Sequence, residues 1–276
     1  ILSDHFASAT VGSWNILSRS QTYLPLGFLV MAALVGLVDD LMNIFGKGPN
    51  SGGLRMRHRI ALYTAIAVVG AVWFYGKLAW TTHYVPFYGF VDLGWWMIPF
   101  FILVIVATGF SVNEIDGLDG LAGGTLLVAF TSLTVIAFLE GKYELAAFIA
   151  VLCGALLAFL WFNIFPARFF MGDTGAMSLG TTLGVVAILT NTALLLPIIG
   201  LLFVAESLSV IIQVTSRKIF KRKVFRSTPI HHHFEAIGWG EPKIVMRFWV
   251  IGAVMAVVGI IIVLVDPSFP RGVLLP

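Results

Sequence analysis

The chain is a succession of long apolar segments separated by short polar ones. A helix that crosses the hydrocarbon core of a bilayer needs about 20 mostly apolar residues, and eight segments approach that length. Their apolar runs are continuous rather than alternating, so they predict helices and not the strands of a barrel. The eight expected spans are residues 24–38, 60–80, 95–110, 121–139, 145–165, 177–190, 193–215 and 244–265.

Four short polar stretches interrupt this pattern, and each carries carboxylates or histidines. Two predicted spans separate each stretch from the next, and two crossings return the chain to the side that it left. All four stretches should therefore lie on one face of the membrane. They are Asp39-Asp40 and residues 113–120, 171–175 and 231–235.

Composition and charge support a membrane protein and give its orientation. Apolar residues make up 59% of the chain and charged residues 11%, whereas soluble domains carry roughly 25% charged residues. Lys and Arg favour cytoplasmic loops, and thirteen lie on the motif-bearing face against four on the other, so the motif face should be cytoplasmic. The thirteen are Lys47, Arg55, Arg57, Arg59, Arg168, Arg217, Lys218, Lys221, Arg222, Lys223, Arg226, Lys243 and Arg247, and the four are Arg19, Lys77, Lys142 and Arg271.

Three further features concern partners, disulfides and completeness. The basic run 217–226 is either ordinary cytoplasmic charge or a contact with anionic membrane lipid. The one cysteine, Cys153, excludes an intrachain disulfide. Because the chain begins at Ile1 without a methionine, we expect it to be part of a longer protein.

The stretch 113–120 has the residues of a phosphate and metal site. Asp116 and Asp119 are three residues apart and would share a face if they lay on a helix. Gly117 permits a tight turn and the close approach of a ligand. Carboxylates and the amide oxygen of Asn113 are hard ligands, suited to magnesium together with substrate phosphates. The alternative is a turn between two spans that binds nothing.

The first and third stretches place further acids at span ends. Asp39 and Asp40 close the first expected span, either as a solvated helix end or as contacts for a cation. Asp173 follows a glycine before the sixth expected span. The ring of Phe170 beside it could stack on a base or anchor the chain at the interface. Asn163 is either a helix-packing amide or a ligand contact.

The histidines and one buried acid complete the candidates. Three consecutive histidines cannot converge on one point, so a zinc site from this run alone is not expected, and one or two of them should bind phosphate instead. Glu206 lies in the middle of a span, and Gln213 follows seven residues later on the same helical face. An ionisable residue at that depth is either functional or hydrogen-bonded between helices.

Taken in order, the four stretches resemble the motifs of the polyprenyl-phosphate N-acetylhexosamine-1-phosphate transferases, and the resemblance covers nearly the whole chain. Residues 231–235, with Gly238-Trp239 and 241–243 after them, resemble the branch that uses phospho-MurNAc-pentapeptide. The family's fold is all-α, with ten membrane helices. The resemblance therefore implies that residues 1–276 form one integral membrane transferase domain, with eight of ten spans visible and two N-terminal helices missing.

The resemblance also implies a reaction and its partners. Magnesium-dependent transfer of phospho-MurNAc-pentapeptide from UDP-MurNAc-pentapeptide to undecaprenyl phosphate would give lipid I and UMP in peptidoglycan biosynthesis. The enzyme would lie in the bacterial inner membrane with its site on the cytoplasmic face, as a possible homodimer and without a nucleic-acid partner.

Three alternatives to this function remain. One is a transferase that uses UDP-GlcNAc, against which the 231–235 run argues. Another is an ion-coupled transporter, suggested by Glu206, but a transporter would carry its acids near the midplane and here nearly all lie at one face. The third is a fragment without activity.

Residue roles follow from the same resemblance. Asp39 and Asp40 match an acid pair proposed as general base or carrier-phosphate contacts. Asp173 matches the magnesium ligand, and Asn113 lies where a second metal or phosphate contact is expected. The implied catalytic set is Asp39, Asp40, Asp173, His231 and His232. The implied substrate contacts are Asn113, Asp116, Gly117, Asp119, Asn163, Phe170, Gln213 and His233, with Phe170 stacking on uracil.

Two positions depart from the family pattern. Asn43 and Arg59 stand where the family commonly has lysine. Arg and Lys bind phosphate with different geometry, so these replacements are expected to alter phosphate binding.

Overall fold

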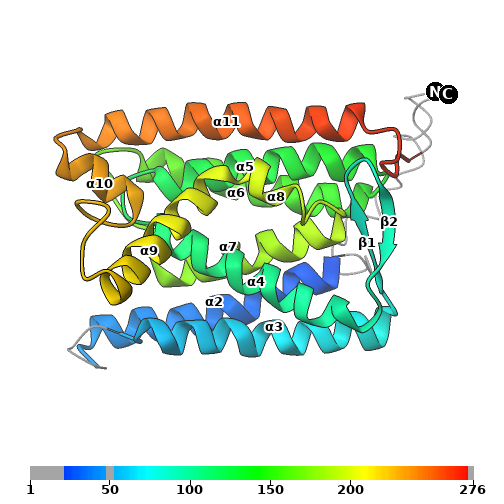
Figure 1. Ribbon diagram of the computed structural model, residues 1–276, viewed down its shortest axis with the longest axis horizontal. Helices are drawn as coiled ribbons and strands as arrows, with labels where there is room; N and C mark the ends of the chain where they lie inside the picture. Colours follow the sequence, from blue (N-terminus) through cyan, green and yellow to red (C-terminus); the bar gives the residue numbers. More distant parts are fainter. Residues whose placement is uncertain (1–21, 48–52, 273–276) are drawn as a thin grey trace.

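The computed structural model describes residues 22–47 and 53–272, and in this part the chain is a bundle of long helices (Figure 1). The predicted all-α membrane fold is confirmed, because seven helices are long and apolar enough to cross a bilayer. The long helices are α2 (Tyr23–Ile44), α3 (Met56–Leu78), α4 (Met97–Ile115), α5 (Leu121–Leu139), α6 (Tyr143–Asn163), α7 (Gly172–Leu189), α9 (Leu201–Ile219) and α11 (Glu241–Val265).

The expected span 193–215 is the exception, and its prediction as one apolar helix was wrong. The segment forms two pieces, the short α8 (Leu196–Ile199) and then α9, with Gly200 between them. Helix α9 is not among the seven helices that satisfy the length and hydropathy of a span. It carries Glu206, Gln213 and two basic residues in its last turn, so one of its faces is polar.

A β-hairpin between α3 and α4 was not predicted. Strands β1 (Thr82–Val85) and β2 (Gly89–Asp92) pair antiparallel, with Thr82 opposite Asp92. A single turn of 3-10 helix, η5 (Gly94–Trp96), leads from it into α4. The sequence suggests only an interfacial belt here, because its Trp and Tyr residues dominate the pattern.

Helix α7 lies between α2 and α4 in the middle of the bundle, and glycines permit these close contacts. A side chain on Gly36 of α2 would clash with the backbone of Asp173 and Thr174. On the other side, a side chain on Gly180 would lie 3.0 Å from the Cα of Gly109 of α4. Small residues allow membrane helices to approach closely, so Gly36 allows the first turn of α7 to pack against α2, and Gly180 allows α7 to pack against α4.

The two ends of the bundle differ. The C-terminal end of α2, the start of α3 and the short helix α10 (Ile230–Ala236) lie at one end, whereas the hairpin lies at the other (Figure 1). The hairpin is fixed to the end of α11 by Asp266, whose Oδ2 accepts hydrogen bonds from the hydroxyl of Tyr84 and from the backbone N–H of Phe87. The predicted grouping of the four polar stretches at one end is thus observed.

Candidate active site

A cavity of about 360 Å³ opens at the end of the bundle that carries α10. Three of the four polar stretches contribute to its wall, together with Arg59 from α3. Its lining residues are Asp40, Arg59, Asn113, Asp116, Gly117, Leu118, Asp119, Asn163, Phe170, Gly172 and Asp173.

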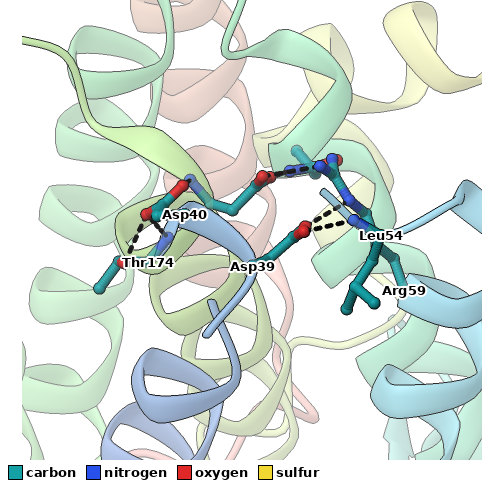
Figure 2. A network of polar contacts seen from close by, with 7 residues as sticks. Asp39, Asp40, Leu54, Arg59 and Thr174 are labelled. Atoms are coloured by element: carbon teal, nitrogen blue, oxygen red, sulfur yellow. Dashed lines mark hydrogen bonds and ion pairs between the residues drawn. The ribbon is translucent and has the colours of Figure 1, made fainter. Parts of the chain in front are cut away.

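Arg59 is the centre of the polar network beside this cavity (Figure 2). Its Nε lies 2.8 Å from Asp39 Oδ2, and its Nη2 lies 2.7 Å from Asp173 Oδ2. Its Nη1 donates to Asn113 Oδ1 at 3.1 Å. One guanidinium therefore joins α3 to α2, α7 and α4, a fork geometry that an ammonium group lacks.

Asp39 is fully buried, and its two oxygens are both in use. Oδ2 meets Arg59, and Oδ1 accepts the backbone N–H of Leu54 at 2.5 Å. The carboxylate thus anchors the start of α3 to α2. Both acids of the pair were expected to close the first span, but α2 continues to Ile44, so they lie on its side rather than at its end.

Asp40 caps the N-terminus of α7 from a neighbouring helix. Its Oδ1 accepts the N–H of Asp173 at 3.0 Å, and its Oδ2 accepts the N–H and the hydroxyl of Thr174 at 2.9 and 2.5 Å (Figure 2). The first N–H groups of a helix have no partner within the helix, and a negative charge there is favourable to its dipole. Asp40 supplies both the hydrogen-bond acceptors for these N–H groups and the negative charge.

Asp173 lies in the first turn of α7, not in a turn before the span as expected. Besides its ion pair with Arg59, its Oδ1 accepts a hydrogen bond from Asn113 Nδ2 at 2.7 Å. The two residues assigned to the metal by resemblance therefore contact one another, and the guanidinium of Arg59 contacts both.

Asp116 and Asp119 do not share a helical face, because α4 ends at Ile115 and both lie in the turn after it. Asp119 Oδ2 accepts the N–H of Ala167 at 2.9 Å, and its own N–H donates to Glu241 at 2.6 Å. Asp119 thus fixes two loops of the cavity wall.

Asp116 is different, because its carboxylate makes no hydrogen bond within the described part of the chain and faces the cavity. Burial, and then the nearby charges of Asp173 and Asp40, raise its pKa to about 7.

The residues of the cavity fit a magnesium ion bound together with phosphate. Four carboxylates line it against one guanidinium, and Asp116 has oxygen lone pairs that no described group uses. No three acidic, histidine or cysteine side chains in the described ranges converge to hold an ion unaided. Magnesium is usually held by one or two carboxylates plus substrate phosphates and water, so a set of three protein ligands is not required for it to bind here.

Phe170 and Asn163 lie on the loop side of the cavity. The ring of Phe170 is 73% exposed, as a stacking surface requires. Asn163 is buried, and it accepts the N–H of Gly120 at 3.0 Å and donates to the carbonyl of Phe169 at 2.9 Å. Asn163 therefore holds the two loops together with the same groups that would otherwise contact a ligand.

The three histidines point to three different partners, as their spacing requires. His231 is buried, and its Nδ1 lies 3.1 Å from Glu206. The Nδ1 of His232 lies 2.5 Å from Glu235 in an exposed pair, and His233 accepts the backbone N–H of Arg226 at 3.1 Å. None of the three is among the residues that line the cavity.

Gln213 lies away from the cavity. Its Oε1 accepts the N–H groups of Val224 and Phe225 at 2.9 and 3.1 Å, and its Nε2 donates to the carbonyl of Phe225 at 2.9 Å. It shapes the loop after α9, a role that its position on a helix does not reveal.

Three residues of the site were not named as candidates from sequence. Arg59 was noted only as a departure from the family pattern, although it touches three of the candidates. Thr174 and Glu241 were not singled out, and both act through contacts with residues more than 100 positions away. The basic residue at the start of a span was the one signal available for Arg59.

Comparisons with known proteins show the family of this chain. The model of glycosyl transferase family 4 matches residues 23–191. The phospho-N-acetylmuramoyl-pentapeptide-transferase of Chloroflexus aggregans is 40% identical over 268 residues, which cover 92% of this chain and 73% of the relative. The proteins of the same name from Leptospira biflexa serovar Patoc and Desulforamulus reducens are 40% and 42% identical, over 89% and 90% of this chain and 74% and 75% of their own lengths.

Proposed function

Because the chain belongs to glycosyl transferase family 4, we propose that it transfers phospho-MurNAc-pentapeptide from UDP-MurNAc-pentapeptide to undecaprenyl phosphate, giving lipid I and UMP. It is a multi-pass bacterial membrane enzyme of the phospho-sugar transferase class. The observation that carries the proposal is the cavity at one end of the spans, where acids, Arg59 and an exposed aromatic ring meet.

The chemistry requires positioning more than proton transfer. An oxygen of the carrier phosphate attacks the β-phosphorus of the nucleotide sugar, and the bond from that phosphorus to the oxygen of UMP breaks. The second pKa of a phosphate monoester is about 6, so the attacking oxygen is already ionised at neutral pH. Asp39 is buried and Asp40 caps α7, so both serve this reaction by fixing the cavity wall rather than by removing a proton.

Charge neutralisation falls to a cation and to Arg59. Asp173 and Asp116 are the residues that would hold magnesium, which when bound offsets the charge of the pyrophosphate and of the leaving phosphate. Arg59 lines the same cavity between Asp39 and Asp173. Its guanidinium is placed to bind a phosphate oxygen while the two carboxylates hold it in position.

The uracil of the nucleotide sugar and the polyprenyl tail of the carrier would bind to separate surfaces of the protein. The ring of Phe170 is placed to stack on the uracil. An apolar groove of about 230 Å³ runs between α4, α7 and the α8–α9 segment, with Leu103, Ala107 and Ser111 on its α4 wall. Helix α4 also carries Asn113 into the polar cavity, so a polyprenyl tail in the groove would present its phosphate at the site.

The orientation of the enzyme is part of this proposal. The excess of Lys and Arg at the cavity end supports a site on the cytoplasmic face, where nucleotide sugars are made. Contact of the 217–226 run with anionic lipid and the formation of a homodimer stay predictions.

The test is a reaction with purified protein, UDP-MurNAc-pentapeptide, undecaprenyl phosphate and magnesium, in which UMP release is measured. We expect release only when both substrates are present, and its loss on addition of a chelator and recovery with excess magnesium. Faster release from UDP-GlcNAc would favour the related GlcNAc-1-phosphate transferases instead. Ion flux across vesicles without any UMP release would favour a transporter.

A further inference from the structure

Glu206 and His231 form a buried carboxylate–imidazole pair, and the reaction as proposed gives Glu206 no role. Glu206 lies within α9 with no exposed surface, and His231 of α10 is 1% exposed. The Nδ1 of His231 lies 3.1 Å from Glu206 Oε2, and the backbone N–H of His231 lies 3.5 Å from the same oxygen. A carboxylate within a membrane bundle is costly without a partner, and His231 is that partner.

The opposite side of the imidazole faces the cavity wall. Both ring nitrogens of His231 are buried, and neither makes a hydrogen bond within the described part of the chain, although Nδ1 lies within ion-pair distance of Glu206. Nε2 has no such partner. It lies against Gly117, where any side chain would clash with it. Gly117 lines the cavity and directly follows Asp116. The ring thus extends from Glu206 to the backbone of the cavity wall, and a glycine there makes room for it.

A carboxylate at Nδ1 decides what the other nitrogen of a histidine can do. When Nδ1–H donates to the carboxylate, the tautomer and the direction of the ring are fixed, and Nε2 is presented on the far side. The exposed pair of His232 and Glu235 cannot do this as firmly, because both side chains are about 40% exposed and water competes for them.

We propose that Glu206 is a positioning residue, which accepts the Nδ1 proton of His231 and thereby directs Nε2 toward the Gly117 side of the cavity, where the substrate pyrophosphate binds. Glu206 itself does not touch the substrate and acts through His231. The kinetic consequence rests on the proposed function, whereas the state of the ring does not.

The state of the ring can be measured on the parent protein. The experiment is nitrogen NMR of protein labelled with 15N-histidine in detergent micelles, with the His231 signals identified by their loss in His231→Gln. At a pH at which this ring is neutral, we expect the proton on Nδ1 and none on Nε2. The opposite tautomer would overturn the proposal, with or without enzymatic activity.

A double-mutant cycle tests the consequence for turnover. Groups that orient metal-ligating histidines cost about 10- to 100-fold when removed. We expect a loss of the same order in the kcat of UMP release for Glu206→Gln, because Glu206 holds the ring of His231 in a comparable way. In a His231→Gln background, Glu206→Gln should cause no further loss, because its effect passes through the ring. Full kcat in Glu206→Gln, or an equal loss in both backgrounds, would reduce Glu206 to a packing residue.

Ser207 offers a matched control on the same helix. Its hydroxyl donates to Ser111 at 2.6 Å in an equally buried position, away from His231. The effect of Ser207→Ala should be the same in the parent and in the His231→Gln background. If the parent protein releases no UMP at all, the proposed function fails, while the NMR measurement still decides whether Glu206 orients the ring.

Discussion

Asp173 has several roles in the structure of the site. It pairs with Arg59, accepts from Asn113, and begins the helix that Asp40 caps. Its negative charge pairs with the guanidinium in this structure, and in the proposed reaction it would also hold the magnesium ion. The substitution Asp173→Asn tests the charge of this side chain separately from its shape, because asparagine keeps the size and one hydrogen-bond acceptor.

Asp173→Asn should lower the rate of UMP release by at least about 100-fold, which is on the order of 3 kcal/mol of transition-state stabilisation. The measurement is kcat over a range of magnesium concentrations. Ser178→Ala, one turn later on α7, removes a hydroxyl bound only to backbone carbonyls and should leave kcat unchanged. Near-normal turnover by Asp173→Asn, still dependent on magnesium, would remove Asp173 from the metal site.

Phe170→Ala should weaken the binding of uridine nucleotides about 5- to 150-fold, because a stacked base is worth about 1–3 kcal/mol. Phe170→Trp should keep much of the affinity, since an aromatic face remains. Calorimetric titration with UDP-MurNAc-pentapeptide gives the comparison.

The adjacent Phe169 is the control for this prediction. Its ring packs near Phe159 and Phe162 and is not among the residues that line the polar cavity. Phe169→Ala should therefore have a smaller effect on nucleotide binding. Unchanged affinity in Phe170→Ala would make that ring an interfacial anchor.

At the scale of elements, the site depends on how α2 meets the first turn of α7. Gly36 permits the contact, and Asp40 fills the cap position that the sequence around α7 leaves empty. A helix cap supplied by a distant helix couples the position of α7 to that of α2. Asp40 thus contributes to the fold by holding the first turn of α7 against α2.

Asp40→Asn should lower the stability of the detergent-solubilised protein by about 1–2 kcal/mol, because the amide keeps one acceptor oxygen but its NH2 group cannot accept the hydrogen bonds that Thr174 donates to Oδ2. For a chain of this size that is a fall of roughly 2–8 °C in Tm. Asp92→Asn, the same change at an exposed residue whose oxygen accepts one backbone hydrogen bond in the hairpin turn, should leave Tm within about 1 °C. Loss of activity by Asp40→Asn with an unchanged Tm would instead favour direct chemistry by Asp40.

The elements that could be predicted from sequence are those that hydrophobic length determines. Helix α5 was expected with its observed bounds, Leu121–Leu139, because Gly120 and Glu140 flank a mostly apolar run without charged residues. The start of α7 was missed, since its first turn is polar and is stabilised by Asp40 from elsewhere. The hairpin was missed because four-residue strands are shorter than any window that detects a span.

In the candidate site, too, some features could be predicted from sequence and others could not. The cavity gathers eight residues that the sequence had singled out, from four segments of the chain: Asp40, Asn113, Asp116, Gly117, Asp119, Asn163, Phe170 and Asp173. Local motifs predict which residues carry chemistry, because their type and spacing are local properties. They cannot predict that Arg59 would join three helices or that Asp119 would bind the N–H of Ala167, since such contacts depend on tertiary packing.

At the scale of the whole molecule, the two ends are chemically unequal. The cavity end holds most of the acids, histidines and cations, whereas the other end holds the hairpin, which Asp266 fixes to the end of α11. This polarity along the bundle axis predicts a fixed orientation in the membrane.

Single cysteines in a Cys153→Ala background test that orientation. Lys221→Cys, in the exposed loop after α9, should resist a membrane-impermeant thiol reagent in intact cells, and Tyr88→Cys, at the 78% exposed hairpin tip, should react. Lysis should make both reactive, as a check on accessibility. Labelling of the Lys221 position from outside would invert the proposed topology. An alternative probe position, Ser51, lies outside the described residues.

Arg59 has a consequence for the stability of the protein when no divalent ion is bound. Since the guanidinium already bridges Asp39 and Asp173, the protein carries a resident counter-ion that keeps these acids from repelling one another when no divalent ion is bound. Chelation should therefore stop turnover without lowering the stability of the helix bundle. In excess chelator we expect Tm to shift by less than about 2 °C. Dilution into magnesium should restore activity at once. A large fall in Tm would mean that the ion stabilises the folded protein, rather than binding only together with substrate.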